Sequence, residues 1–290
     1  DEPNEPKRII HPGSELLPMP SRADRSELET NSCTLSDGRK LAYCTVGSQM
    51  GDPIVVHHGT PGSRLFAAVC SEAAAELNLR VVVPDRPGYG RSTPPPQGWS
   101  WRDWRSDLFE LLDAEGIDRA SLVGYSGGGP FALAAATRDR TPRVALVSSA
   151  IPPVRNWLAS LSRVPFALRV LFRASKPLVQ FGSREALVRQ YTDRSVSETT
   201  ARAVTEEFHE ALRQGAAATA RETRMSATRS LDPPPPTISV RAWHGRRDAN
   251  APIHPVRSFL DDTGTVVSTE SDHLGTLLDR RRDVFEWAAK

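Results

Sequence analysis

The sequence contains very little cysteine. Its 290 residues include only three, Cys33, Cys44 and Cys70, and none of them forms a CxxC pair. An odd number of widely spaced cysteines predicts neither a disulfide framework nor a zinc site. The sequence therefore favours a reducing compartment. We expect a cytoplasmic protein and leave open that a signal peptide was removed before Asp1.

Long apolar runs and an excess of charge of either sign are also missing. No segment approaches the ~18 consecutive apolar residues of a transmembrane helix. The 37 Lys and Arg residues against 35 Asp and Glu leave a net charge of only +2. Such a balance is untypical of a surface that binds nucleic acid or acidic membranes. We expect neither a nucleic-acid partner nor an integral membrane segment, and the oligomeric state stays open.

Two kinds of ligand motif are absent as well. Glycine-rich phosphate loops require GxGxxG or a GK[ST] ending, and the sequence has neither. His, Asp, Glu and Cys residues do not cluster at the spacing of a catalytic metal site. We therefore expect no cofactor and no metal. The composition is that of an ordinary globular protein, with 39% hydrophobic and 25% charged residues, so a packed core can form.

Short apolar runs alternate with helical segments along most of the chain. An Asp37-Gly38 turn between strand-like segments 32–35 and 39–46 predicts an antiparallel hairpin. Later runs are continuously apolar, which is typical of parallel strands covered on both faces. These runs lie at 53–58, 80–83, 120–124, 144–148, 237–243 and 265–269, and the helical segments at 63–77, 100–115, 127–138, 254–261 and 274–289. The pattern predicts an α/β fold with a doubly wound, mostly parallel sheet.

This alternation stops after Ala150. The following segment contains no parallel-strand run, whereas 185–191 and 197–214 have helical spacing, the second with Ser197 placed to cap it. A proline-rich segment at the N-terminus has a composition that buries little and is expected to stay mobile or to wrap the surface. The predicted division of the chain is an N-terminal extension at 1–29, a core at 30–150 and 231–290, and an inserted helical cap, or lid, at 151–230.

The most specific motif is Gly-x-Ser-x-Gly at residues 124–128, where a predicted strand meets a predicted helix. In a nucleophile elbow of this kind the serine occupies a sharp turn, and the flanking small residues let strand and helix approach closely. Ser126 is therefore the predicted nucleophile. A serine hydroxyl is a weak nucleophile, so it needs a general base and a group that orients this base.

His273 is the best candidate for the base, because it lies between the last predicted strand and the last helix, at the same edge of the sheet as Ser126. Asp248 follows the preceding strand and gives the chain order Ser, Asp, His, so it is the candidate acid. Asp272 is a local rival, although a residue next to the histidine usually points away from it. Asp85 lies in a loop rich in glycine and proline, which we expect it to brace.

Acyl transfer also develops an oxyanion, which backbone N–H groups can stabilise. The loop at 58–63 follows the strand expected beside that of the nucleophile, and Pro61 in this loop has no N–H. Thr60 is therefore a candidate donor, together with Gly127 directly after the nucleophile. A plain turn between strand and helix is the alternative for this loop.

Five segments together resemble the α/β-hydrolase fold superfamily, in its branch with a helical lid: HGTPGS (58–63), DRPGYGRS (85–92), GYSGGGP (124–130), WHGxxD (243–248) and DHLG (272–275). The resemblance covers about residues 30 to 290. It implies Ser126 as nucleophile, Asp248 as acid, His273 as base, and Thr60 and Gly127 as oxyanion donors. Because epoxide hydrolases and haloalkane dehalogenases carry aspartate at the elbow, it also argues against those two activities.

The sequence thus predicts a serine esterase-like hydrolase. It would cleave a small or medium carboxylic ester, lactone or thioester through an acyl-enzyme, with a small-molecule acyl substrate as its partner. Two alternatives stay open: a ligand-binding protein that keeps the pocket without turnover, and C–C bond hydrolysis or aminopeptidase activity at the same site. The lid carries no motif of a named subfamily, so the resemblance does not choose the substrate.

Overall fold

The computed structural model describes residues 28–155, 157–161, 164, 166–168, 170–171, 183–261 and 263–290. The predicted N-terminal extension falls almost entirely outside these residues.

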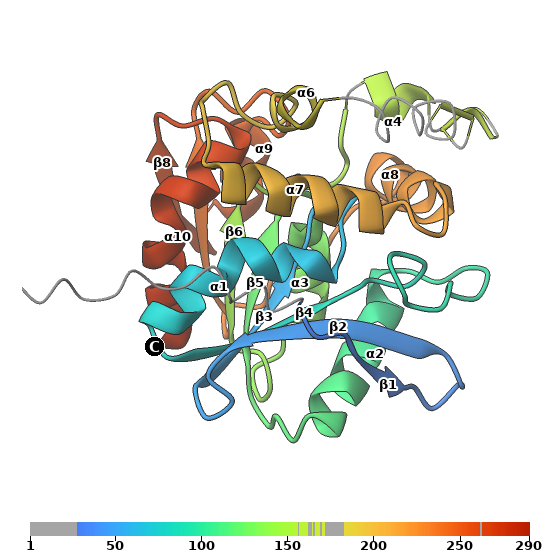
Figure 1. The fold of residues 1–290 in the computed structure, drawn as a ribbon, viewed down its shortest axis with the longest axis vertical. Helices are drawn as coiled ribbons and strands as arrows, with labels where there is room; N and C mark the ends of the chain where they lie inside the picture. The colour runs from blue at the N-terminus through green and yellow to red at the C-terminus, as the bar shows by residue number, and fades with distance from the viewer. Residues whose placement is uncertain are drawn as a thin grey trace, which may run out of the picture.

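A mostly parallel sheet organises the described residues (Figure 1). Its strand order is β1-β2-β4-β3-β5-β6-β7-β8. The β1–β2 and β2–β4 pairs are antiparallel, and the remaining neighbours are parallel. The strands are Asn31–Thr34 (β1), Lys40–Gly47 (β2), Asp52–His57 (β3), Leu79–Pro84 (β4), Ser121–Tyr125 (β5), Arg143–Val147 (β6), Ser239–Gly245 (β7) and Gly264–Thr269 (β8). The predicted sheet and its N-terminal hairpin are confirmed.

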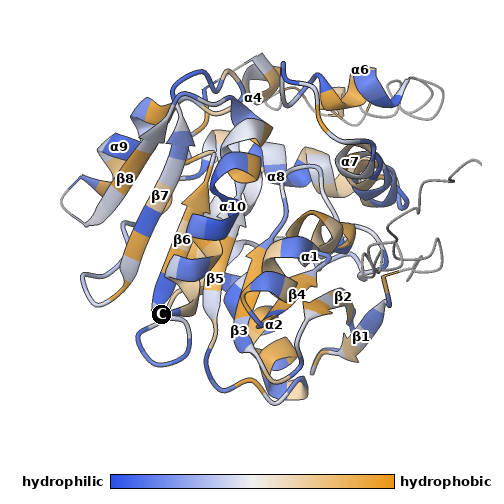
Figure 2. Ribbon diagram, turned by 60° about the vertical axis from the view of Figure 1, so that its left-hand side comes forward, coloured by the Kyte–Doolittle hydropathy of each residue, from blue (hydrophilic) through white to orange (hydrophobic). Residues whose placement is uncertain are grey.

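Each face of the sheet is covered by helices. Ala67–Glu76 (α1) and His273–Ala289 (α10) pack on one face, and Trp101–Ala114 (α2), Gly129–Ala135 (α3) and Ile253–Leu260 (α9) on the other. Successive residues of one strand enter opposite cores: Val55 belongs to the α2/α3 side, and Ile54 and Val56 to the α1/α10 side. The strands are therefore apolar without alternation, as Figure 2 shows for β4 and β5.

Several predicted boundaries differ from the structure: the helix expected at 127–138, for example, is a 3-10 turn, Ser126–Gly128 (η2), followed by α3. The helix expected at 63–77 is split into a short 3-10 turn, Arg64–Phe66 (η1), and α1. The strand expected at 237–243 begins at Ser239 and continues to Gly245. Its start is delayed because the amide of Ile238 donates a hydrogen bond to the carbonyl of Pro235 at 2.9 Å, which closes a turn after the proline run.

The segment between β6 and β7, called the insertion below, contains helices joined by turns and irregular stretches where it is described. It contains Trp157–Leu161 (α4), Arg184–Val188 (α6), Glu198–Ala211 (α7) and Ala217–Thr228 (α8), which lie across one end of the sheet (Figure 1). The Ser197 hydroxyl accepts a hydrogen bond from the amide of Thr200 at the start of α7, as predicted. Helix α8 was not predicted. That the insertion acts as a lid stays a prediction.

The topology itself places the site. The chain adds β4 on one side of β3 and then crosses to β5 on the other side, so the direction of winding reverses between β3 and β5. Open α/β sheets leave a ligand crevice at the carboxyl ends of strands at such a switch point. The loops that leave β3 and β5 carry Gly59 and Ser126, so two motifs distant in sequence meet there. Among the residues described, no helix is both long and apolar enough to cross a bilayer.

Candidate active site

Ser126 stands in a strained turn directly after β5. Its φ of 51° lies in the left-handed region, which a non-glycine residue adopts only at an energetic cost. The glycines around it permit the tight crossing of strand and helix. A Cβ on Gly124 would lie 2.6 Å from Gly129 Cα, and one on Gly128 would lie 2.2 Å from the carbonyl oxygen of His57. The predicted strand, turn and helix around Ser126 are therefore present.

Asp248 and His273 form a buried pair. Asp248 Oδ2 lies 2.8 Å from His273 Nδ1, and both side chains are almost fully enclosed. Because a carboxylate only accepts, Nδ1 carries the hydrogen and Nε2 is left as a proton acceptor. The amides of Asn250 and Ala251 donate to the other oxygen of Asp248 at 3.0 and 2.8 Å. Burial opposes the charge of Asp248, but His273 and these contacts together hold its pKa below the usual value.

The position of His273 is fixed from several sides. The Ser148 hydroxyl donates to the carbonyl oxygen of His273 at 2.8 Å, and the amide of Leu274 donates to the carbonyl oxygen of Tyr191 at 2.9 Å. The rings of Tyr125 and Tyr191 lie 5.2 and 6.3 Å from the imidazole. Residues of the core and of the insertion therefore both fix the position of the imidazole.

Asp272 has a different task from that of Asp248. Its Oδ1 accepts from the amide of Gly275 at 2.8 Å and caps α10. Its Oδ2 accepts from the Thr192 hydroxyl at 2.8 Å and the Asp193 amide at 2.9 Å. The carboxylate next to the histidine therefore ties the helix to the insertion, and the contact to the imidazole comes from Asp248.

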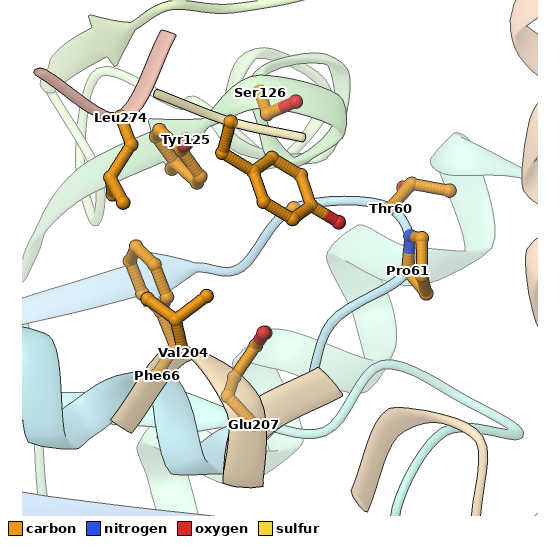
Figure 3. Close-up of a pocket in the computed structure, with 10 residues that line it drawn as sticks. Thr60, Pro61, Phe66, Tyr125, Ser126, Val204, Glu207 and Leu274 are labelled. Carbon is orange, nitrogen blue, oxygen red and sulfur yellow. The ribbon is translucent and has the colours of Figure 1, made fainter. Parts of the chain in front are cut away.

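Ser126 and the histidine region meet at a narrow cavity with a volume of about 30 Å³ (Figure 3). Its lining residues are Gly59, Thr60, Pro61, Phe66, Tyr125, Ser126, Tyr191, Val204, Glu207 and Leu274. Within the described ranges no hydrogen bond joins the Ser126 hydroxyl to His273. Such contacts are often long before substrate binds and shorten in the complex.

The two candidate oxyanion donors are neighbours. A Cβ on Gly127 would lie 2.4 Å from Thr60 Oγ1 and 3.2 Å from the Thr60 nitrogen. Only glycine leaves room for the Thr60 loop at this point. The loop after β3 therefore closes against the turn that carries Ser126, as the predicted pairing of Thr60 with Gly127 requires.

A buried ion pair that sequence reasoning missed fixes the Thr60 loop. Arg86 and Glu222 of α8 are 0% and 1% exposed, and Arg86 Nη2 lies 2.8 Å from Glu222 Oε2. The same guanidinium donates to the carbonyl oxygens of His58 and Gly59 at 2.6 and 2.8 Å. The Thr60 hydroxyl donates to Glu222 at 2.7 Å. The insertion and the loop are thus parts of one hydrogen-bond network.

Glu207 of α7 is the second residue that sequence reasoning missed. Its Oε1 accepts from the amide of Ser63 at 2.8 Å, and the Ser63 hydroxyl donates to the Glu207 carbonyl at 2.9 Å. Burial raises the pKa of this carboxyl to about 8. A signal was available: Glu207 falls between Val204 and Phe208 on the buried stripe of the helix.

The remaining titratable groups near the site have structural tasks. His57 accepts from Trp104 Nε1 at 3.0 Å, and burial lowers its pKa to about 3. Burial also lowers the pKa of His58, so both imidazoles are neutral. Asp85 accepts from the amides of Arg64 and Arg91 and braces its loop as expected. In the part of the chain that the structure describes, no three His, Cys, Asp or Glu side chains are grouped to hold a metal ion.

Comparison with known proteins agrees with this architecture. The chain is 36% identical over 124 residues to a non-heme chloroperoxidase of Streptomyces lividans, covering 42% of this chain and 45% of that protein. It is 30% identical over 122 residues to Lipase 1 of Psychrobacter immobilis, covering 40% and 36%. The chain thus spans less than half the length of these curated relatives.

The similarity of fold extends further than the similarity of sequence. The crystal structure of the enol-lactonase from Burkholderia xenovorans LB400 superposes with a TM-score of 0.63 at 21% identity, covering 88% of this chain and 96% of that one. A family model described as the alpha/beta hydrolase family matches residues 54–287, which include most of β3, all of β4 to β8 and every residue of the candidate site. The chain therefore belongs to the alpha/beta hydrolase family.

Proposed function

We propose that the protein is a serine hydrolase that cleaves esters of small acyl groups through an acyl-enzyme on Ser126. One observation carries the proposal: the imidazole of the buried Asp248–His273 pair lies against Tyr125 and Tyr191, which line the same cavity as Ser126. A carboxylate-oriented imidazole beside a serine at a nucleophile elbow is the arrangement that activates a hydroxyl for acyl transfer.

Each group has a defined step in this mechanism. His273 Nε2 takes the proton of Ser126 while Oγ bonds to the ester carbonyl carbon, and the carbonyl electron pair moves onto its oxygen. The amides of Thr60 and Gly127 donate to this oxyanion. When the carbonyl re-forms, the alcohol leaves with the proton from His273. Water then repeats the sequence on the acyl-enzyme and releases the acid.

The size of the cavity supports a small acyl group. A space of 30 Å³ corresponds to about two or three waters at roughly 10–15 Å³ each. We therefore expect acyl groups of two to four carbons to be preferred over longer chains. The relatives named above are called a peroxidase and a lipase, so names alone do not choose the substrate.

The test is hydrolysis of p-nitrophenyl esters from acetate to octanoate by purified wild type, Ser126→Ala and a matched serine variant. Ser71→Ala is suitable, because the Ser71 hydroxyl donates to the carbonyl of Ala68 in its own helix, away from the site. We expect kcat/KM to be highest for acetate to butyrate and to fall about 10³-fold or more in Ser126→Ala. Full activity in Ser126→Ala, or no turnover of any ester by wild type, would contradict the proposal.

A further inference from the structure

The cavity contains a carboxyl group that the mechanism above does not use. Glu207 reaches it from α7, opposite Ser126, and its side chain points into the cavity (Figure 3). Oε1 is held by the Ser63 amide. The other oxygen, Oε2, has no hydrogen-bond partner among the described residues. One oxygen is therefore anchored and the other is available to a bound acyl group.

Among the described residues, no ion pair joins a cation to this carboxyl. The nearest guanidinium, that of Arg86, is committed to Glu222 and to two backbone carbonyls of the Thr60 loop. His58, which lies against Gly62 together with Glu207 Oε1, is neutral because burial holds its pKa well below the ordinary value.

The groups that face Glu207 act on its pKa in both directions, and the upward shift prevails. Burial is the largest cause of the raised pKa, and the negative charge of Asp85 adds to it. The Ser63 amide and the charge of Arg86 oppose this shift only in part. Tyr125 and Tyr191, which share the cavity, have pKa values above the ordinary tyrosine value and remain neutral.

At neutral pH the carboxyl is therefore a carboxylic acid. A carboxylic acid accepts on one oxygen and donates from the other. With Oε1 accepting from Ser63, the O–H of Oε2 is the donor that faces the cavity. Phe66, Val204 and Leu274 line the cavity together with Glu207, as do Tyr125 and Tyr191. The buried Tyr125 hydroxyl has no hydrogen-bond partner among the described residues.

We propose that Glu207 is a specificity-determining residue that selects short acyl groups carrying a hydrogen-bond acceptor, such as the oxygen of an alkoxyacyl or oxoacyl group. The inference rests on the proposed function, because it requires an acyl group on Ser126. An acyl chain bound to Ser126 extends into the one space that both residues line, where an ether or keto oxygen meets the Glu207 donor. A purely aliphatic chain leaves that donor without a partner, which costs binding free energy.

The experiment compares p-nitrophenyl methoxyacetate with p-nitrophenyl butyrate, whose acyl groups have the same number of heavy atoms. The measured quantity is the ratio of their kcat/KM values between pH 6 and 9.5. The pH dependence of the Ser126–His273 chemistry is common to both esters and cancels in this ratio. The higher intrinsic reactivity of the methoxy ester is the same in every variant.

For wild type we expect the ratio to fall about 3- to 10-fold as pH rises through 8, when the donor is lost. Glu207→Gln keeps an acceptor for Ser63 and an N–H₂ donor for the cavity, so its ratio is expected to stay high at every pH. Glu207→Leu is expected to give the low ratio throughout. The matched control is Glu206→Gln, an exposed neighbour on the same helix, which should follow wild type.

Two results would overturn the inference while the proposed function stands. One is a ratio in wild type that does not change with pH, although both esters are hydrolysed in a Ser126-dependent way. The other is a preference at pH 7 for the trimethylammonioacetyl ester over the methoxyacetyl ester, which requires an ionised Glu207. Failure of wild type to hydrolyse either ester would overturn both proposals. If Glu207→Leu does not fold, the kcat/KM ratios of wild type and Glu207→Gln are sufficient to test the inference.

Discussion

The cavity has a core wall, which carries Ser126, and an insertion wall, which carries Glu207. The buried carboxyl groups of the two sides differ in the direction of their pKa shifts. On the core side Asp248 is paired with His273, and its pKa is lowered. On the insertion wall Glu207 is bound by a backbone amide and forms no ion pair within the described part of the chain, and burial raises its pKa to about 8. The same functional group is thus an anion on one wall and an acid on the other. In the proposed function, the core therefore carries the bond-breaking chemistry and the insertion selects the acyl group.

The strongest test of this assignment is to replace each of the two aspartates near the base with asparagine. Asp248→Asn should lower kcat by about 10⁴-fold, because Nδ1 loses the carboxylate that sets the tautomer of His273. Asp272→Asn should change kcat only a few-fold, since asparagine caps a helix about as well as aspartate. Rates of p-nitrophenyl acetate hydrolysis decide between them. A loss in Asp272→Asn as large as that in Asp248→Asn would refute the assignment of the acid.

The ion pair that joins the two walls is tested by stability. Arg86→Ala leaves Glu222 buried without its partner and should lower the free energy of unfolding by about 3–5 kcal/mol. The matched control is Arg102→Ala, whose partner Asp232 lies 3.8 Å away with both side chains about 90% exposed. This surface pair should contribute almost nothing. Urea unfolding measures both. If both substitutions lower the free energy of unfolding equally, the Arg86–Glu222 pair does not join the walls.

The sequence predicts the core wall far better than the insertion wall, for physical reasons. The strands follow from apolar runs such as 54–56, and the turn of Ser126 needs only residues adjacent in sequence. Glu207 carries a local signal, its place on an apolar helix stripe. Glu222 carries no such local signal, because α8 consists of small and polar residues without an apolar stripe. Its partner Arg86 lies 136 residues away in sequence.

The contact between Thr60 and Gly127 tests the oxyanion assignment on the core wall. The methyl group of Gly127→Ala would lie 2.4 Å from Thr60 Oγ1, so the loop must shift away from the turn. We expect kcat to fall about 10²–10³-fold, the loss typical of one missing oxyanion donor. KM for p-nitrophenyl acetate should change little. A normal kcat in a correctly folded Gly127→Ala protein would argue against these donors.

The last comparison concerns stability and pH on the insertion wall. Glu207 in the folded state binds its proton up to about pH 8, whereas the ordinary value is 4.5. Between these values the folded state holds more protons than the unfolded state, so the contribution of Glu207 to stability falls as pH rises. Glu207→Gln does not titrate. Its Tm relative to wild type should therefore increase from pH 5 to pH 8.5.

The control for this series is again Glu206→Gln, whose Tm difference from wild type should stay small at every pH. A Glu207→Gln difference that is constant or that decreases with pH would mean that the carboxyl is ionised in the folded protein. The contrast between an ionised Asp248 and a protonated Glu207 would then be wrong.

The most direct test of the central claim is to locate the covalent intermediate. Wild type is incubated with a fluorophosphonate, digested with trypsin and analysed by tandem mass spectrometry, with His273→Ala as the matched variant. The account predicts one adduct, on Ser126 and not on Ser121 within the tryptic peptide 120–138, and much slower labelling of His273→Ala. An adduct on another residue, or an unlabelled Ser126 in protein that hydrolyses esters, would contradict it.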